Sequence, residues 1–278
     1  MTNPRKASQL DVDKAFAKVR REIATEGGVQ EIGYFGHEAR YKRNINRILD
    51  LTTPGAILLD IGSHFLHQAA VLSELGYRVI GMDVAEFASV ELIKQRARNF
   101  DIQNHAVDRL DRGDFLKGYE NQIDLVVFSE IQEHITFNPI RFWQQIYHLL
   151  KIGGVIYLTT PNSLTVWKMA NALKRLLTLR GYGITVEEIV DRVTYGHHWK
   201  EYSAYELRRL FRALSPDFDV TISPYELRSF EKLIGLKAGV RNLVRRASSS
   251  LPLFREELEA VITLTGRSAW HVEPPDYF

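Results

Sequence analysis

The sequence predicts a doubly wound α/β fold, in which a mostly parallel sheet of seven strands carries helices on both faces. Short β-branched runs alternate with longer segments of helical periodicity along most of the chain. The chain has 278 residues, of which 45% are hydrophobic, and this is enough for one large core. We therefore expect one elaborated α/β domain.

Seven apolar runs are the expected strands of this sheet. Most are rich in β-branched residues, as strands buried on both faces usually are. The run near residue 104 has the weakest pattern. The expected strands are residues 57–61, 78–82, 104–107, 123–128, 155–159, 218–222 and 260–265.

Two helices are expected before the first strand. Apolar residues recur at helical spacing in residues 11–25 and again in residues 37–51, and Gly27-Gly28 separates the two segments. We therefore assign residues 1–54 to an N-terminal helical cover. Residues 55–278 then form the main domain.

The later helices carry terminal signals. Gly76 is a natural end for the helix between the first two strands, and Pro139 is a favoured first-turn residue. Ser203 and Glu206 have the spacing of a capping box. Residues 163–180 are expected to form a basic amphipathic helix, within an inserted lid at about residues 163–196. A second basic segment, residues 233–244, is expected to connect the last two strands.

Composition excludes several classes of site. The chain has no cysteine, which excludes disulfides and thiolate metal sites. The polar start of the chain and the lack of a long apolar run favour a soluble, cytoplasmic protein. A formal net charge of only +2 is too small to imply nucleic acid binding by itself.

Two acids follow the first two expected strands. Asp60 lies at the end of the first strand, and Asp83 follows the second strand. Ligands of open α/β sheets bind beyond the carboxyl ends of the strands, and an acid at the second strand binds ribose hydroxyls in dinucleotide sites. The pair favours an adenosine-containing ligand, although acids also end strands for structural reasons.

The turn between these acids narrows the choice of ligand. It reads Gly62-Ser63-His64-Phe65-Leu66-His67 and contains one glycine, whereas a pyrophosphate needs several for close backbone approach. S-adenosylmethionine has no phosphate, and a carboxylate such as that of Asp60 suits its cationic end. The turn therefore favours S-adenosylmethionine over NAD or FAD.

Several further motifs follow in a fixed order. They are Asp124-Leu125-Val126, Glu133-His134, Leu150-Lys151-Ile152-Gly153-Gly154, Thr160-Pro161-Asn162 and His198-Trp199-Lys200-Glu201-Tyr202-Ser203. In this order and spacing the chain resembles the class I S-adenosylmethionine-dependent methyltransferases, a broad group that includes polyprenyl-quinone-type O-methyltransferases. The resemblance covers about residues 55–221 and the closing strands. The chain departs from that pattern where His64 and Leu66 replace glycines and Ile152 replaces a proline.

The resemblance implies a Rossmann-like methyltransferase fold with S-adenosylmethionine as cofactor. It implies that the turn after the first strand contacts the methionine part of the cofactor and that the acid at the end of the second strand binds the ribose. It also implies that an acid before the fourth strand binds the adenine amino group. A serine after the fourth strand would lie beside the sulfonium. The residues so assigned are Asp60, Gly62, Ser63, His64, Asp83, Val84, Asp114 and Ser129.

The transfer itself needs the acceptor aligned and its proton removed. Histidine suits proton transfer near neutral pH, so His134 and His198 are the candidate catalytic residues. His197, beside the second of them, is expected at the surface.

The same region predicts a possible metal site. Glu130, Glu133 and His134 would share one side of a helical turn, and oxygen and nitrogen ligands suit a divalent cation such as Mg²⁺, Mn²⁺ or Zn²⁺. The pattern resembles the metal site of quinone O-methyltransferases and, with His198, that of small-RNA 2′-O-methyltransferases. In metal-free relatives the histidine simply packs at a helix start, and this alternative stays open.

We therefore expect an S-adenosylmethionine-dependent methyltransferase that acts on an oxygen of a small metabolite, saccharide or lipid-linked intermediate. One alternative is an RNA 2′-O-methyltransferase, which the modest charge opposes. Another is a non-catalytic scaffold, favoured by the missing glycines. The expected partner is a small-molecule acceptor, with peripheral membrane contact possible through residues 163–180.

Overall fold

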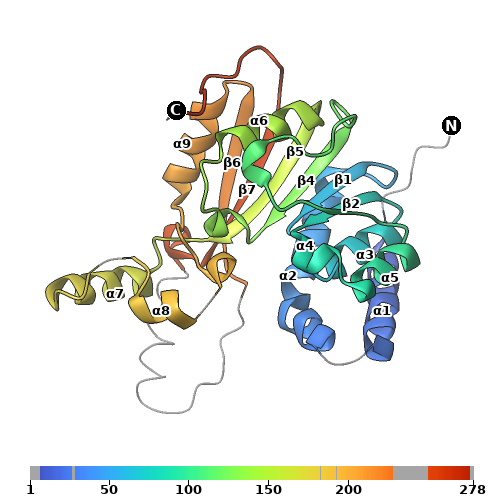
Figure 1. Cartoon of the computed structure of the whole chain (residues 1–278), viewed down its shortest axis with the longest axis horizontal. Helices are drawn as coiled ribbons and strands as arrows, with labels where there is room; N and C mark the ends of the chain where they lie inside the picture. The colour runs from blue at the N-terminus through green and yellow to red at the C-terminus, as the bar shows by residue number, and fades with distance from the viewer. Residues whose placement is uncertain (1–6, 27–28, 182, 192, 228–249, 276–278) are drawn as a thin grey trace. The chain divides into compact units, whose positions relative to one another are not determined.

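The computed structural model describes residues 7–26, 29–181, 183–191, 193–227 and 250–275. The predicted helix break at Gly27-Gly28 and the basic segment 233–244 lie outside these residues. Figure 1 labels the helices and strands that are discussed below.

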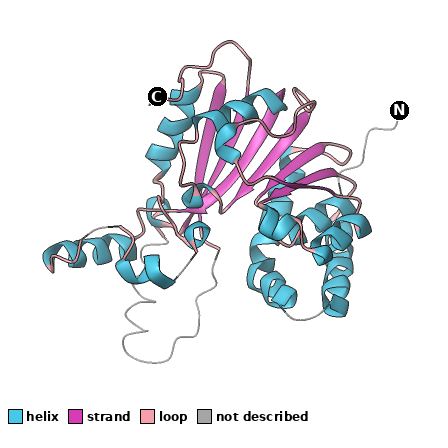
Figure 2. Cartoon of the chain, viewed as in Figure 1, coloured by secondary structure: helices cyan, strands magenta, loops and turns pink. Residues whose placement is uncertain are grey.

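The described residues form a seven-stranded sheet in the order β3-β2-β1-β4-β5-β7-β6 (Figure 2). The predicted sheet is therefore confirmed. The strand β5 begins earlier than expected and includes Gly153-Gly154. The strands are β1 (Ile57–Ile61), β2 (Arg78–Asp83), β3 (Gln103–Ala106), β4 (Ile123–Ser129), β5 (Leu150–Pro161), β6 (Phe218–Tyr225) and β7 (Glu257–Leu264).

The strand β1 lies where the strand order reverses. It pairs in parallel with β2 on one side and with β4 on the other. In this register Asp60 is opposite Gly81 of β2 and Val127 of β4. All five residues of β1 are buried. Because ligands of doubly wound sheets bind at such a switch point, the end of β1 is a candidate ligand site.

The described residues also form helices along most of the chain. They are α1 (Gln9–Glu26), α2 (Val29–Leu51), α3 (His67–Glu74), α4 (Ala85–Ala88), α5 (Glu91–Asn99), α6 (Ile140–Leu149), α7 (Val166–Leu177), α8 (Val186–Asp191) and α9 (Ala204–Leu214). Short 3₁₀ turns are η1 (Leu110–Arg112), η2 (Gln132–His134), η3 (Thr194–Gly196) and η4 (Pro252–Phe254).

The helix α2 begins before the predicted residue 37 and continues through two glycines. Glycine lowers helix propensity, which is why the sequence pattern favoured a later start. A Cβ at Gly33 would lie 3.4 Å from the ring of Phe65 and 3.7 Å from that of His67. Gly33 therefore lies next to the rings of Phe65 and His67, in the segment after β1.

Contacts divide the chain into two compact units. The first comprises residues 1–128, 140–157 and 263–267, and the second comprises residues 129–139, 158–262 and 268–278. The expected helical cover, residues 1–54, thus belongs to the same unit as β1, β2 and β3. The predicted boundary at residue 54 stays a prediction.

Buried polar contacts hold the N-terminal helices within the first unit. Arg96 of α5 is fully buried; its Nε donates to Glu22 Oε2 of α1 at 2.9 Å, and its Nη1 donates to the carbonyl oxygen of Phe65 at 2.8 Å. Asn44 of α2 donates to Gln68 of α3 at 2.9 Å. Both contacts attach the helical cover to the segment that follows β1.

The predicted lid, residues 163–196, contains α7 and α8 in the second unit (Figure 1). The hydroxyl of Thr165 caps α7 by accepting from the backbone N–H of Lys168. No residue of α7 is buried, and Leu173 and Leu177 are exposed by 57% and 75%. Among the described helices, none is long and apolar enough to span a membrane.

The capping box at α9 is confirmed. Ser203 Oγ accepts from the backbone N–H of Glu206 at 3.2 Å, and Glu206 Oε2 accepts from the backbone N–H of Ser203 at 3.0 Å. We expect Ser203→Ala to lower the free energy of unfolding by about 1 kcal/mol, because it removes one acceptor for the helix start. Chemical denaturation measures this change, and an unchanged midpoint would contradict the assigned cap.

Candidate functional site

The turn after β1 has a left-handed backbone at every second residue. Gly62, His64 and Leu66 have φ angles of 71°, 48° and 60°. Only glycine adopts this conformation freely, and other residues lose about 1–2 kcal/mol in it. The two positions where glycine is missing thus keep the conformation to which glycine is best suited, and the substitutions do not straighten the turn.

Burial of Leu66 offsets this backbone cost. The side chain of Leu66 is fully buried, and its Cδ2 atom lies 2.7 Å from the position that a Cβ on Gly81 of β2 would take. Complete burial of a leucine side chain contributes roughly 1.5–3 kcal/mol. Leu66 and Gly81 are therefore complementary, because the absence of a side chain on β2 makes room for the leucine.

This complementarity predicts a destabilising effect of Gly81→Ala. The new methyl group would overlap the Leu66 side chain and approach Ser63 Oγ, so we expect a loss of about 2 kcal/mol in the free energy of unfolding. Leu66→Ala should be less damaging in the Gly81→Ala background than alone. Gly36→Ala is the matched control, because nothing lies within 4 Å of a Cβ there. Additive effects of the first two substitutions would contradict the account.

Backbone N–H groups orient the carboxylate of Asp83. Its Oδ2 atom accepts from the backbone N–H of His64 at 2.7 Å, and its Oδ1 atom accepts from that of Val84 at 2.8 Å. A carboxylate oxygen can accept more than one hydrogen bond. Asp83 is thus oriented while it keeps acceptor capacity for two hydroxyls, as a ribose would require.

The ring of His64 packs between two phenylalanine rings. Its centroid lies 4.1 Å from that of Phe65 and 4.5 Å from that of Phe87. Burial lowers the pKa of His64 below its usual value. In this structure the residue supplies a backbone donor to Asp83 and an aromatic surface beside it. Its predicted contact with the cofactor stays a prediction.

Asp60 and Asp83 form an acidic pair in the first unit. Burial and the negative charge of Asp83 raise the pKa of Asp60 from 3.8 to about 7, and only 4% of Asp60 is exposed. Burial also raises the pKa of Asp83, although the N–H groups of His64 and Val84 oppose this effect. Such a pair is suited to a cationic group, because the positive charge would allow both acids to ionise.

The helix α2 supplies a residue near Asp60, Tyr41, that the sequence pattern did not indicate. Burial and the charge of Asp60 raise the pKa of the Tyr41 hydroxyl, and the neighbouring Arg40 opposes this effect. Tyr41 precedes β1 in the chain and belongs to no motif. It became a candidate only because folding places α2 against the segment after β1.

The structure places two further predicted cofactor contacts, Asp114 and Ser129. Asp114 follows η1 and is exposed, beside the buried Phe115. Ser129 ends β4 in the second unit, and its hydroxyl lies 2.8 Å from that of Thr159. Their assignments to adenine and to the sulfonium stay predictions.

A cluster of candidate metal ligands lies in the second unit. One ligating atom from each of Glu133, His134 and His198 lies within 4.8 Å of the other two. The rings of His134 and His198 have centroids 4.9 Å apart and are nearly perpendicular. Residues that are far apart in the sequence, in η2 and after η3, are thus brought together.

The predicted place of Glu130 in this set is wrong. The helical turn begins at Gln132, and Glu130 precedes it with a φ of 58°. Glu130 therefore does not share a helical face with Glu133, and it does not belong to the cluster found among the described residues. It still acts on the cluster, since its negative charge contributes to the raised pKa of Glu133.

Each residue of the cluster forms a hydrogen bond with a residue outside the cluster. His134 Nδ1 lies 3.0 Å from the carbonyl oxygen of His197, and His198 Nδ1 lies 3.0 Å from Glu201 Oε1. A carbonyl or carboxylate oxygen only accepts, so each Nδ1 carries the hydrogen and each Nε2 of the neutral rings keeps its lone pair. Thr160 Oγ1 donates to Glu133 Oε2 at 2.8 Å.

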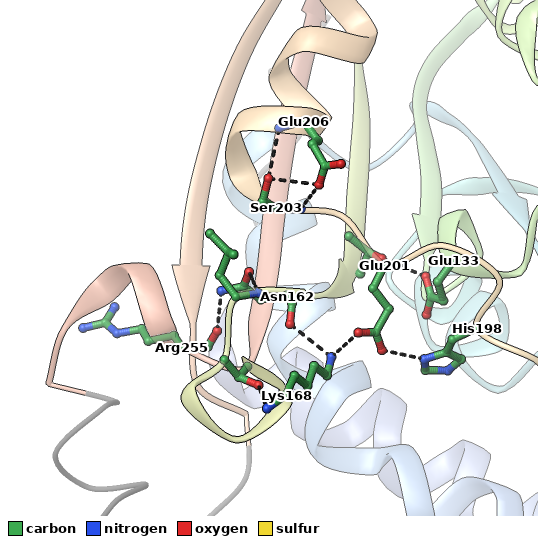
Figure 3. A network of polar contacts seen from close by, with 11 residues as sticks. Glu133, Asn162, Lys168, His198, Glu201, Ser203, Glu206 and Arg255 are labelled. Carbon is green, nitrogen blue, oxygen red and sulfur yellow. Dashed lines mark hydrogen bonds and ion pairs between the residues drawn. The ribbon is translucent and has the colours of Figure 1, made fainter. Parts of the chain in front are cut away.

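The expected surface position of His197 is wrong, because the residue is only 4% exposed. Its backbone turns its carbonyl oxygen toward His134, which the sequence pattern could not show. The motif residues Thr160 and Glu201 also gain a role from the fold. Figure 3 shows Glu201 beside His198, with Glu133 close to the same histidine.

The other oxygen of Glu133 has no hydrogen-bond partner among the described residues. Glu133 is fully buried, and its Oε1 atom lies 3.9 Å from His134 Nε2. Burial and the charge of Glu130 raise the pKa of Glu133 to about 7. A buried carboxylate oxygen that faces a nitrogen lone pair needs either a proton or a cation, so the donor set fits a metal ion.

Comparison with known proteins identifies the family. A family model described as a methyltransferase domain matches residues 34–215, which is more than half of the chain. The chain belongs to the class I S-adenosylmethionine-dependent methyltransferases. The predicted family and fold are confirmed.

Individual relatives are distant from this methyltransferase. A probable S-adenosylmethionine-dependent methyltransferase of Mycolicibacterium smegmatis is 28% identical over 140 residues, which are 50% of this chain and 49% of that protein. The match thus spans about half the length of this curated relative.

Two solved structures share the fold. A SAM-dependent methyltransferase from Archaeoglobus fulgidus has a TM-score of 0.50 and 18% identity, and the match covers 83% of this chain and 98% of that one. Phosphoethanolamine N-methyltransferase 2 of Haemonchus contortus, bound to S-adenosyl-L-methionine, has a TM-score of 0.51 and 14% identity over 81% of this chain and 53% of that one.

Proposed function

We propose that this methyltransferase transfers the methyl group of S-adenosylmethionine to an oxygen of a small-molecule acceptor, with a divalent cation held by Glu133, His134 and His198. One observation carries the proposal. Three ligating atoms lie within 4.8 Å of one another, and each of the three side chains has its own hydrogen-bond partner outside the cluster. Metal-binding histidines usually have such outer partners, which fix the tautomer and the ring orientation.

The proposed reaction is an in-line displacement. A bond forms between the acceptor oxygen and the methyl carbon while the carbon–sulfur bond breaks, and S-adenosylhomocysteine leaves. The acceptor must also lose its hydroxyl proton, which passes to solvent water, and a bound cation would lower the pKa of that hydroxyl enough for water to accept the proton. Hydrogen bonds orient the three side chains of the proposed site. His197 and Glu201 orient the two imidazole rings, and Thr160 orients the carboxylate of Glu133.

The ligand types favour zinc or manganese over magnesium. Two of the three ligands are imidazoles, which suit transition metals, whereas Mg²⁺ prefers carboxylate, carbonyl and water oxygens. Two ligands of one zinc ion lie at most about 4 Å apart, given bonds of about 2 Å. The cluster, at up to 4.8 Å, would therefore close slightly around the ion.

Calorimetric titration of chelator-treated protein tests the proposal. We expect zinc chloride and manganese chloride to bind with one ion per chain, and magnesium chloride to bind more weakly. If none of the three salts binds, the cation is excluded. The histidines would then remain only as general bases for the acceptor.

The lid favours an acceptor with an apolar part. Trp167, Leu173 and Leu177 of α7 are exposed by more than half, in a helix that also carries Lys174 and Arg175. A lipid-linked or natural-product acceptor fits this surface better than a bare saccharide does. Contact of residues 163–180 with an anionic membrane stays a prediction, which flotation with phosphatidylserine vesicles would test.

The RNA alternative makes a different prediction. Phosphate-driven binding weakens steeply as salt rises. Filter binding of a short RNA duplex at 50 and 200 mM salt separates the two functions, because a small-molecule enzyme should retain little RNA at either concentration. Tight, salt-sensitive retention would favour the RNA 2′-O-methyltransferase.

A further inference from the structure

Lys168 connects the lid to the body of the second unit. It lies in the first turn of α7, and its Nζ atom donates to the carbonyl oxygen of Asn162 at 3.0 Å. The same atom lies 2.6 Å from Glu201 Oε2 (Figure 3). Asn162 is itself fixed, because its Nδ2 atom donates to the carbonyl oxygens of Leu253 and Arg255 at 2.9 and 2.8 Å. The start of α7 is therefore anchored, although no residue of the helix is buried.

Glu201 shares its two oxygens between the lid and the cluster. Its Oε2 atom pairs with Lys168, and its Oε1 atom lies 3.0 Å from His198 Nδ1. Glu201 thus bridges a lid lysine and a histidine of the proposed cation site.

We propose that Lys168 and Glu201 are positioning residues that make the geometry of His198 depend on the placement of the lid helix α7. The proposal rests on the proposed function, since it concerns a residue of the same site. Lys168 restrains Glu201, and Glu201 restrains His198 with the hydrogen on Nδ1. The ring of His198 is then held beside Glu133 and His134.

Side-chain entropy explains why the lysine matters. A glutamate has several rotatable bonds, and fixing such a side chain costs conformational entropy. The ion pair with Lys168 fixes Glu201 before a cation or acceptor binds, so this cost does not fall on binding. Displacing the first turn of α7 would release Glu201 and leave His198 free to rotate or change tautomer. The placement of α7 would therefore affect the geometry of His198.

Two measurements on the full-length protein test this coupling. The first is the tautomer of His198 in metal-free protein, read from long-range ¹H–¹⁵N NMR of ¹⁵N-histidine-labelled chains. The second is the affinity for zinc chloride, measured by calorimetry. Lys168→Met is the main variant and Glu201→Gln the second. Lys174→Met is the matched control, because it removes another lysine of α7 that lies outside the network, and Lys168→Arg should restore the ion pair.

We expect His198 to carry its hydrogen on Nδ1 in the wild type, the control and Lys168→Arg, and to become mixed in Lys168→Met and Glu201→Gln. Zinc affinity should fall about 10- to 100-fold in Glu201→Gln and less in Lys168→Met. His134 is an internal reference, since the carbonyl of His197 fixes its tautomer. An unchanged His198 signal in Lys168→Met would overturn the coupling.

The two measurements separate this inference from the proposed cation site. If zinc fails to bind the wild type but Lys168→Met alters the His198 signal, the coupling stands and the cation is excluded. If zinc binds the wild type, and Lys168→Met changes neither signal nor affinity, the cation site stands and the coupling is wrong.

Discussion

Asp60→Asn is expected to weaken binding of S-adenosylmethionine at pH 7.5 by about 100-fold or more. The substitution removes the buried charge that would pair with the cationic methionine end, and breaking such a buried pair costs several kcal/mol. Calorimetric titration at several pH values measures the effect. Because the pKa of the free carboxyl is about 7, wild-type affinity should also fall as pH drops from 7.5 to 5.5, whereas that of Asp60→Asn should not.

The same substitution should alter the pH dependence of stability. The folded-state pKa of Asp60 is raised, so its stabilising effect is present below about pH 4 and is lost as pH rises through about 7. The difference between 3.8 and about 7 corresponds to roughly 4 kcal/mol at most. The free energy of unfolding of the cofactor-free wild type should fall more between pH 5 and 8 than that of Asp60→Asn. Parallel curves would contradict the buried acidic pair.

Substitution of either cluster histidine is expected to remove the cation. His134→Ala and His198→Ala should each weaken zinc binding by at least about 100-fold, more than loss of an outer partner would. Zinc at 100 times its dissociation constant should stabilise the wild type by about 2.7 kcal/mol, and thermal unfolding with and without the ion should show this gain lost in both variants.

Controls make this result specific. His148→Ala changes a histidine of α6, in the first unit, and should keep the zinc effect. The double variant should be little worse than either single variant, because the residues act as one site. Full zinc binding by both single variants would show that the ion lies elsewhere.

Much of the fold was predictable because its signals are local. Buried β-branched runs predicted the strands, and Ser203 with Glu206 predicted the start of α9, which the structure confirms. The position of Asp60 at the end of the first strand followed from the apolar run of residues 57–61. By contrast, the early start of α2 was not predicted, because Gly33 and Gly36 lower the helix propensity of this segment.

The sites were predictable as residue sets but not as geometries. Spacing drew attention to Glu133 and His134, and the resemblance drew attention to His198; the structure brings these three residues together. Spacing also assumed a helical turn that begins only at Gln132, so Glu130 does not share their face. The role of the His197 carbonyl oxygen depends on backbone direction, which residue types do not encode. Three left-handed residues in the turn after β1 show that missing glycines need not change a backbone path when a buried side chain such as Leu66 offsets the strain.

Anomalous diffraction at the zinc edge, from crystals grown with zinc and S-adenosylhomocysteine, tests the proposed chemistry most directly. We predict one strong peak about 2.0–2.2 Å from a Glu133 carboxylate oxygen and from Nε2 of both His134 and His198. We also predict that the ribose of S-adenosylhomocysteine binds to the carboxylate of Asp83. The absence of a peak at these three residues, with the cofactor product bound, would contradict the metal-assisted O-methyl transfer proposed for this chain.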